Sequence, residues 1–183
     1  FVTARLNGED GLGGIYPAMA NTVMMFDTLG YPAEHPDAAI AWAAVRKLLV
    51  EERDRAYCQP CLSPVWDTGL AGHALAEAGG GQAAAVAAAN AWLREKQILD
   101  VMGDWQAARP NARPGGWAFQ YQNPHYPDVD DTAVVAMLLH RQDAAGHAEA
   151  IGRARDWVLG MQGRDGGWGA FDADNNHHYL NHI

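Results

Sequence analysis

Three aspartates stand close together in residues 128–132, directly before an apolar stretch. Asp128, Asp130 and Asp131 fall within this run, which continues into the apolar residues 133–139. An aspartate at the start of a helix accepts hydrogen bonds from the first backbone amides, and carboxylates there also complement the helix dipole. A structural capping role is therefore one explanation of the cluster.

The same spacing also suits a strong general acid. Neighbouring carboxyl groups cannot all ionise cheaply, so one of them keeps a proton near neutral pH and the three titrate as a unit. Protonation of an isolated carbon–carbon double bond needs this proton and also a stabilised conjugate base. A helix N-terminus supplies part of that stabilisation through its dipole and free amides, and a further cationic or hydrogen-bonding partner would still be required.

Aromatic residues on turns and helix starts surround this cluster in the sequence. They are Trp66, Trp117, Phe119, Tyr121, Tyr126, Trp168 and Phe171. Ring faces attract cations without offering lone pairs that would quench them, and each contributes about 0.5–2 kcal/mol. Carbocation chemistry would use such rings, although tryptophans that simply fill a helical core give the same composition.

Alanine-rich segments with helical periodicity recur along the chain, and each ends at glycine or proline. The expected helices cover residues 17–29, 36–50, 66–78, 82–97, 131–140 and 147–161. They pair into three hairpins with packed, glycine- and tryptophan-rich corners, which leave little room for strands. The sequence therefore predicts an all-α fold in which residues 1–183 form part of one domain, and we treat the chain as an internal fragment with both ends truncated.

An internal repeat of about sixty residues joins helix ends to tryptophans. Gln97 is followed by Gly-Asp-Trp105, and Gln162 is followed by Gly-Gly-Trp168. A glutamine amide at a helix end can bond the exposed backbone of the next loop while an indole packs over a neighbouring helix. We therefore predict that these four residues clamp helices together and take no part in chemistry.

Composition excludes several classes of protein. The 13 basic and 22 acidic residues include no basic run, which argues against a nucleic-acid partner. Cys58 and Cys61 have zinc-like spacing but lack a second ligand pair, so we expect no metal site and two small packed thiols. We expect the histidines His177, His178 and His182 to be solvated. No phosphate-binding glycine loop is present, so no nucleotide cofactor is expected.

The motifs read in order resemble the squalene-hopene cyclase family. They are Ser-Pro-Val-Trp-Asp-Thr-Gly-Leu at 63–70, Gly-Gly-Trp-Ala-Phe-Gln at 115–120 and Tyr-Pro-Asp-Val-Asp-Asp-Thr-Ala at 126–133, with repeats similar to the family's QW motifs. The resemblance covers essentially the whole chain. It implies an (α/α) barrel of helical hairpins, monotopic attachment to the cytoplasmic face of a membrane through parts absent here, and a homodimer.

The resemblance also implies roles for individual residues. Asp130 would donate a proton to the terminal double bond of squalene, supported by Asp128 and Asp131, and a histidine beyond Ile183 would pair with the central aspartate. The cavity-lining residues that stabilise cyclic cations would be Trp66, Phe119 and Phe171, the last where relatives often carry tyrosine. The reaction is an isomerisation to hopene or hopanol in hopanoid biosynthesis and needs no cofactor. We expect the isolated fragment to be inactive.

Three alternatives can be weighed against this resemblance. Class II diterpene cyclases resemble the same Asp-x-Asp-Asp-Thr-Ala run but act on a diphosphate, and the paired repeats with the Ser-Pro-Val-Trp-Asp run favour a triterpene cyclase. Oxidosqualene cyclases resemble a variant with a single acid, whereas three acids suit the protonation of an unoxidised olefin. A non-catalytic α-toroid that binds a prenyl group or a protein would reuse the same repeats, because fold does not imply function. An acid triplet facing an apolar aromatic cavity would favour a cyclase, whereas Asp130 on an outer solvent face would favour the scaffold.

Overall fold

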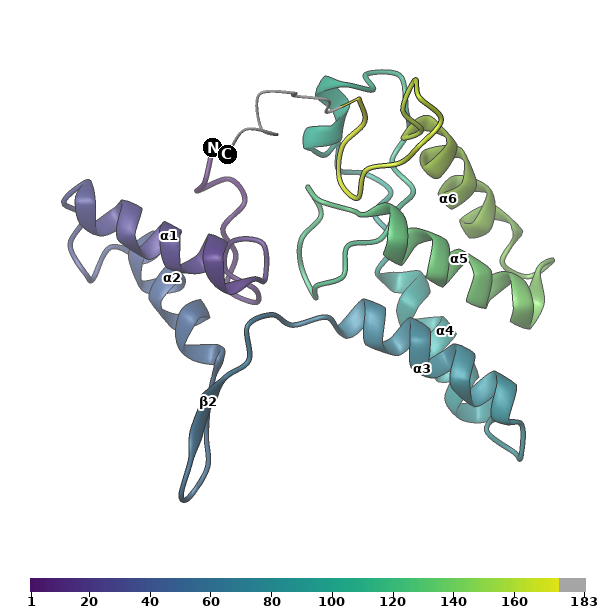
Figure 1. Cartoon of the computed structure of the whole chain (residues 1–183), viewed down its shortest axis with the longest axis horizontal. Coiled ribbons are helices and arrows are strands. Elements are labelled where there is room, and N and C mark those ends of the chain that lie inside the picture. The colour runs from purple at the N-terminus through teal and green to yellow at the C-terminus, as the bar shows by residue number, and fades with distance from the viewer. Residues whose placement is uncertain (175–183) are drawn as a thin grey trace. The chain divides into compact units, whose positions relative to one another are not determined.

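The computed structural model describes residues 1–174, and these residues are largely helical (Figure 1). The elements in chain order are α1 (Tyr16–Thr28), α2 (Pro36–Lys47), β1 (Leu49–Glu51), β2 (Ala56–Cys58), α3 (Pro64–Ala78), α4 (Ala83–Glu95), the 3₁₀ turn η1 (Asp104–Ala107), α5 (Val129–Asp143) and α6 (Ala148–Gly160). All six predicted helices are present among the described residues. The prediction of an essentially helical fold is confirmed.

Helix boundaries follow proline and glycine. Pro36 occupies the first position of α2, and the ring of His35 before it accepts a hydrogen bond from the Asp37 amide. Gly30 follows α1 with φ +74°, and the three glycines 79–81 that follow α3 also have positive φ. Glycine adopts this left-handed backbone without a Cβ clash, which ends the helices where the sequence predicted.

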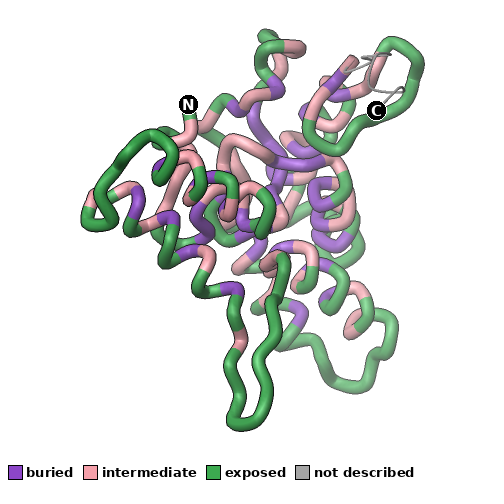
Figure 2. The backbone as a smooth tube through the Cα atoms, turned by 60° about the vertical axis from the view of Figure 1, so that its left-hand side comes forward, coloured by how far each residue is buried: buried purple, intermediate pink, exposed green. Residues whose placement is uncertain are grey.

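A short β-hairpin follows α2 and was not predicted. We expected the second helix to continue to Val50, but Val50 lies in β1 and pairs with Tyr57 of the antiparallel strand β2. A β-branched residue opposite an aromatic residue is a favourable cross-strand pair, which explains why the helix ends early. Both strands are mostly exposed, as the green hairpin in Figure 2 shows.

The chain divides into two compact units. Unit 1 consists of Phe1–Pro64 with Phe119–Asn123, and unit 2 consists of Val65–Ala118 with the residues from Pro124 onward. In unit 1, α1 packs against α2. The segment Phe119–Asn123 is held in unit 1 because the Gln120 amide donates to the Gly13 carbonyl and the buried Asp10 carboxylate accepts the Gln122 amide.

Helix α5 is the centre of unit 2. It packs against α6 and α4, and α3 approaches it closely, since a Cβ on Gly69 would lie 3.1 Å from Val134. The buried core consists of Val65, Leu93, Trp117, Val135, Leu138, Leu139, Ala150 and Ala154. None of the helices within residues 1–174 has the length and apolar character needed to cross a bilayer.

Candidate active site

The acid cluster occupies the N-terminus of α5. Asp128 is the N-cap residue, with an extended backbone, and its Oδ1 accepts the Asp131 amide at 2.7 Å. Asp128 and Asp131 are only 3% and 4% exposed, whereas Asp130 is exposed. The capping role and the acid cluster therefore coexist, because one carboxylate caps the helix while its neighbour is buried beside it.

Burial raises the pKa of both buried carboxyl groups. The pKa of Asp131 rises from an ordinary 3.8 to about 8, mainly through burial, with the nearby charge of Asp128 adding to it. The pKa of Asp128 rises from 3.8 to about 6, again through burial, while its hydrogen bonds to Asp131 oppose the increase. The buried pair therefore keeps a proton at neutral pH, and the pKa of Asp131 is the more strongly raised of the two. Crowding was the predicted cause, but desolvation is the larger one.

A fourth carboxylate and two unpaired oxygens belong to the same region. Asp67, in the first turn of α3, adds its charge to the causes that raise the pKa of Asp131. Asp128 Oδ2 and Asp131 Oδ1 are buried and have no hydrogen-bond partner among the described residues. Buried oxygens without partners are unfavourable, but the buried Trp105 indole nitrogen outside the cluster has none either, so these oxygens do not by themselves distinguish a functional site.

Two loops fix the cluster from outside the helix. The Asp128 amide donates to the Trp117 carbonyl at 2.9 Å, and the Val129 amide donates to the Ala170 carbonyl at 2.9 Å. The Thr132 hydroxyl donates to the Asp128 carbonyl at 2.6 Å and accepts the Trp117 amide at 2.9 Å. The first turn of α5 is therefore bonded to residues far away in the sequence.

The three predicted cavity-lining aromatic residues are placed differently. Trp66 is half-buried in the first turn of α3. It directly precedes Asp67, whose charge raises the pKa of Asp131, so Trp66 lies at the helix end that interacts with the cluster. Phe171 is exposed and directly follows Ala170, which bonds to α5. Phe119 belongs to unit 1 and is half-buried. Its place in the same cavity stays a prediction.

The repeat glutamines each bond the loop that follows their helix. The Gln97 amide donates to the carbonyls of Gly115 at 2.8 Å and Ala150 at 2.9 Å. The Gln162 amide donates to the Gly166 carbonyl at 2.8 Å. Gln97 therefore connects α4 with both the 115–118 loop and the first turn of α6.

The sequence analysis paired Trp105 with Trp168 as equivalent residues of the repeat, but in the structure Trp117 is the equivalent of Trp168. The Trp168 indole donates to the Val158 carbonyl at 2.8 Å, and the Trp117 indole makes the equivalent bond to the Leu93 carbonyl at 2.6 Å. Trp105 is instead fully buried edge-to-face against Trp157, with ring centroids 6.2 Å apart. The sequence reasoning missed the anchoring role of Trp117, although Gly-Gly-Trp recurs at 115–117 and 166–168.

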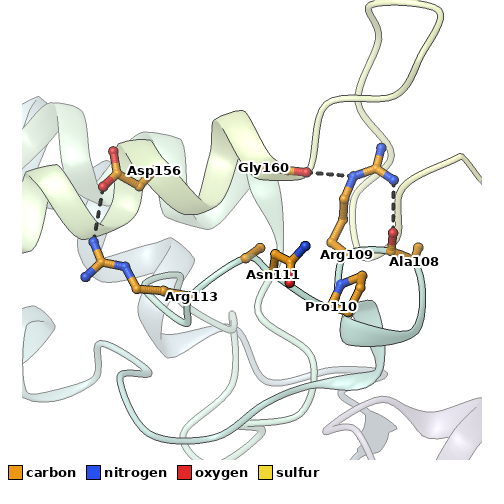
Figure 3. A pocket seen from close by; sticks show the side chains of 8 residues that line it. Ala108, Arg109, Pro110, Asn111, Arg113, Asp156 and Gly160 are labelled. Atoms are coloured by element: carbon orange, nitrogen blue, oxygen red, sulfur yellow. Dashed lines mark hydrogen bonds and ion pairs between the residues drawn. The ribbon is translucent and has the colours of Figure 1, made fainter.

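A surface depression of about 530 Å³ lies beside the C-terminus of α6 (Figure 3). Arg109 lines it and donates to the carbonyls of Gly160 and Gln162 at 2.8 Å each, and its guanidinium also pairs with Asp174 at 2.9 Å. The final carbonyls of a helix lack partners within it, so a guanidinium that binds them has a structural role. This depression is lined by residues outside the acid cluster.

The cysteines and histidines give no metal site in the described part of the chain. Both Cys58 and Cys61 are free thiols, and Cys58 is exposed on β2. The expectation of two packed thiols is wrong for Cys58, because the unpredicted hairpin carries it into solvent. No group of three or more potential ligands occurs among residues 1–174. His177, His178 and His182 lie outside the described residues.

Helical hairpins with tryptophan-anchored loops and a proton-retaining acid cluster at a helix start place the chain among the helical terpene cyclases. The family model of the squalene-hopene cyclase C-terminal domain matches residues 62–183, and that of the N-terminal domain matches residues 1–54. The chain belongs to the squalene-hopene cyclase family.

Individual relatives agree with this assignment. The chain is 57% identical to the squalene–hopene cyclase of Zymomonas mobilis over its whole length and 30% of that protein. It is 58% identical to a probable squalene–hopene cyclase of Sinorhizobium fredii, again over its whole length and 29% of the relative. The squalene–hopene cyclase of Alicyclobacillus acidocaldarius is 40% identical over 98% of this chain and 29% of its own length. The chain thus spans about 30% of these relatives.

Proposed function

We propose that the complete protein containing this chain is a squalene-hopene cyclase, which converts squalene into hopene or hopanol by acid-initiated polycyclisation. The observation that carries the proposal is the carboxyl pair buried at the start of α5, in which Asp131 has a pKa of about 8. Relatives of 57% and 58% identity that are named for this activity support the same substrate. Nothing in residues 1–174 favours a diphosphate substrate.

Asp130 is the proposed proton donor. The assignment rests on its central position in the Asp-Val-Asp-Asp motif, and Asp130 is also the member that the described residues leave uncovered, while Asp128 and Asp131 are buried. In the proposed step the Asp130 carboxyl must first be protonated; its O–H bond then breaks, the proton goes to a terminal alkene carbon, and the electron pair of that double bond forms the new C–H bond. The carboxylate left behind lies in the first turn of α5, where the helix dipole stabilises negative charge.

The exposure of Asp130 also bears on the scaffold alternative. An outer, solvent-facing Asp130 would favour a binding scaffold, and Asp130 is exposed in this chain. The chain spans only about 30% of the length of its relatives. A residue exposed in this chain can therefore be covered in the complete protein. The raised pKa of Asp131 and the cyclase relatives favour catalysis, since a scaffold has no use for a proton-retaining carboxyl group.

The cation formed by protonation is attacked by successive double bonds until the rings close. Trp66 and Phe171 are the proposed aromatic partners in unit 2, and Phe119 in unit 1 has the same proposed role. Each ring face contributes about 0.5–2 kcal/mol to cation stabilisation. The last cation loses a proton to give hopene or captures water to give hopanol. Membrane-lipid contact on the cytoplasmic face and a homodimer belong to the same proposal.

The test is product analysis of the complete enzyme supplied with squalene in detergent. Gas chromatography with mass spectrometry is expected to show pentacyclic products for the wild type and none for Asp130→Asn. The matched control is Asp54→Asn, which changes an exposed carboxylate between β1 and β2 and is expected to keep activity. Circular dichroism verifies folding. Conversion of geranylgeranyl diphosphate but not squalene by the wild type would replace the proposal with a class II diterpene cyclase, and conversion of neither would favour the scaffold.

A further inference from the structure

Trp117 connects the end of one helix with the start of another. Its indole is fully buried, and the indole N–H donates to the Leu93 carbonyl at 2.6 Å in the last turn of α4. The Leu93 carbonyl also accepts the Lys96 amide at 3.0 Å, so the indole bonds a carbonyl that the helix end already holds in place, and this fixes the tryptophan to one point on α4.

The backbone of Trp117 is bonded to the acid cluster. Its N–H donates to Thr132 Oγ1 at 2.9 Å, and its C=O accepts the Asp128 N–H at 2.9 Å. The Thr132 hydroxyl in turn donates to the Asp128 carbonyl at 2.6 Å. Asp128 is the N-cap of α5, so these bonds set where its carboxyl group lies relative to Asp131.

The preceding residue leaves no room for the loop to move inward. A Cβ on Gly116 would lie 2.8 Å from Thr132 Oγ1, 2.9 Å from Pro127 Cβ and 3.0 Å from Trp157. The Gly116 carbonyl also accepts the Ile98 amide at 3.0 Å. Protein interiors packed this closely transmit a displacement to their neighbours, so a shift of Trp117 would reach the first turn of α5.

We propose that Trp117 is a positioning residue for the acid cluster, with its indole anchored on α4 and its backbone holding Asp128 and Thr132. The inference rests on the proposed function, because it assigns Trp117 to the initiation of that reaction. Trp117 touches no reacting atom in this role. It acts through the backbone geometry of the acid cluster.

The first test compares Trp117→Phe with Trp105→Phe in the complete enzyme. Both variants lose the same atoms from a fully buried indole, but the Trp105 N–H has no hydrogen-bond partner among the described residues. We expect Trp117→Phe to lower kcat about tenfold, which is about 1.4 kcal/mol of transition-state stabilisation, with KM nearly unchanged. Trp105→Phe is expected to change kcat much less. Equal losses in the two variants would overturn the proposal.

The second test needs no turnover. Infrared difference spectroscopy follows the band of protonated aspartate as pH rises, and Asp131→Asn identifies the band of that residue. We expect Trp117→Phe to lower the midpoint by about half a pH unit or more, because a looser cluster is better hydrated. Trp105→Phe should leave it in place. Asp130 on α5 and Asp67 on α3, whose charges reach Asp131, are unchanged in both variants.

These outcomes separate the two proposals. A wild type that makes no product from squalene contradicts the proposed function, and the infrared titration still tests the role of Trp117. A wild-type titration midpoint in Trp117→Phe overturns the positioning role whatever the activity. If Trp117→Phe does not fold, Thr132→Val is used instead, because it removes the hydroxyl that accepts the Trp117 N–H at similar side-chain volume. Thr132→Ser keeps the hydroxyl and is expected to restore the titration. Identical titrations of these two variants would also overturn the proposal.

Discussion

Replacing Asp131 by asparagine is expected to make the protein more stable near neutral pH. The pKa of Asp131 is about 8 in the folded chain against an ordinary 3.8. Between these pH values the unfolded chain releases a proton that the folded chain keeps. The folded state then binds more protons, so the free energy of unfolding falls as pH rises, and the loss is complete above about pH 8.

The magnitude follows from the number of pH units that are crossed between the two pKa values. Each unit corresponds to about 1.4 kcal/mol, so the folded protein loses about 3 kcal/mol between pH 5 and pH 7 through this one group. An asparagine amide stays neutral in both states and has no such slope. The stabilisation by Asp131→Asn should therefore be greater at pH 7 than at pH 5 by up to about 3 kcal/mol, less what the neighbouring Asp128 carboxyl contributes when it titrates in the variant, while cyclase activity falls.

The assay is urea unfolding of the complete enzyme at the two pH values, with Asp54→Asn as the exposed control. Comparing the same variant at two pH values cancels any packing effect of the amide, because that effect does not titrate. A stability change for Asp131→Asn that is the same at pH 5 and pH 7 would refute the reasoning. It would mean that Asp131 is ionised in the folded enzyme at pH 7.

Two further pairs of substitutions test the supports of the cluster. Gly116→Ala is expected to destabilise the protein by about 1–3 kcal/mol, because the new Cβ would lie 2.8 Å from Thr132 Oγ1. Gly152→Ala is its control and should be neutral or stabilising in urea unfolding, since nothing lies within 4 Å of that Cβ in α6. Gln97→Leu removes two bonds and should cost about 1–3 kcal/mol, more than Gln162→Leu, which removes one exposed bond. A larger loss for Gln162→Leu would contradict the hydrogen-bond assignment.

Local signals predicted the helices well. Proline and glycine determine helix ends through their own backbone preferences. The start of α2 at Pro36 and the end of α3 before glycines 79–81 could therefore be predicted without tertiary contacts. The β-hairpin could not be predicted from such local signals. Val50 also fits a helical pattern, and only its pairing with Tyr57 across the strands decides the conformation.

The site was predictable in composition but not in its electrostatics. The three aspartates and their helix were identified from the sequence, whereas the division into buried and exposed carboxyl groups depends on neighbours such as Trp117 and Ala170. Trp117 was not predicted to be an anchor, because the first Gly-x-Trp sequence after Gln97 ends at Trp105. Gln97 bonds the Gly115 carbonyl just as Gln162 bonds the Gly166 carbonyl. The Gly-Gly-Trp run at 115–117 is therefore the equivalent of the run at 166–168.

A proton donor for an olefin must both carry a proton and touch the substrate, and in the described residues these two properties are found on neighbouring carboxyl groups. Keeping a proton at neutral pH favours burial, as in Asp131, whereas touching the substrate requires exposure, as in Asp130. Loss of the donor should therefore abolish product, while Asp131→Asn removes a neutral hydrogen-bonding neighbour and should leave a residual rate. If the ranking of Asp130→Asn and Asp131→Asn is reversed, the donor is Asp131, and the complete enzyme must open the first turn of α5 to the substrate.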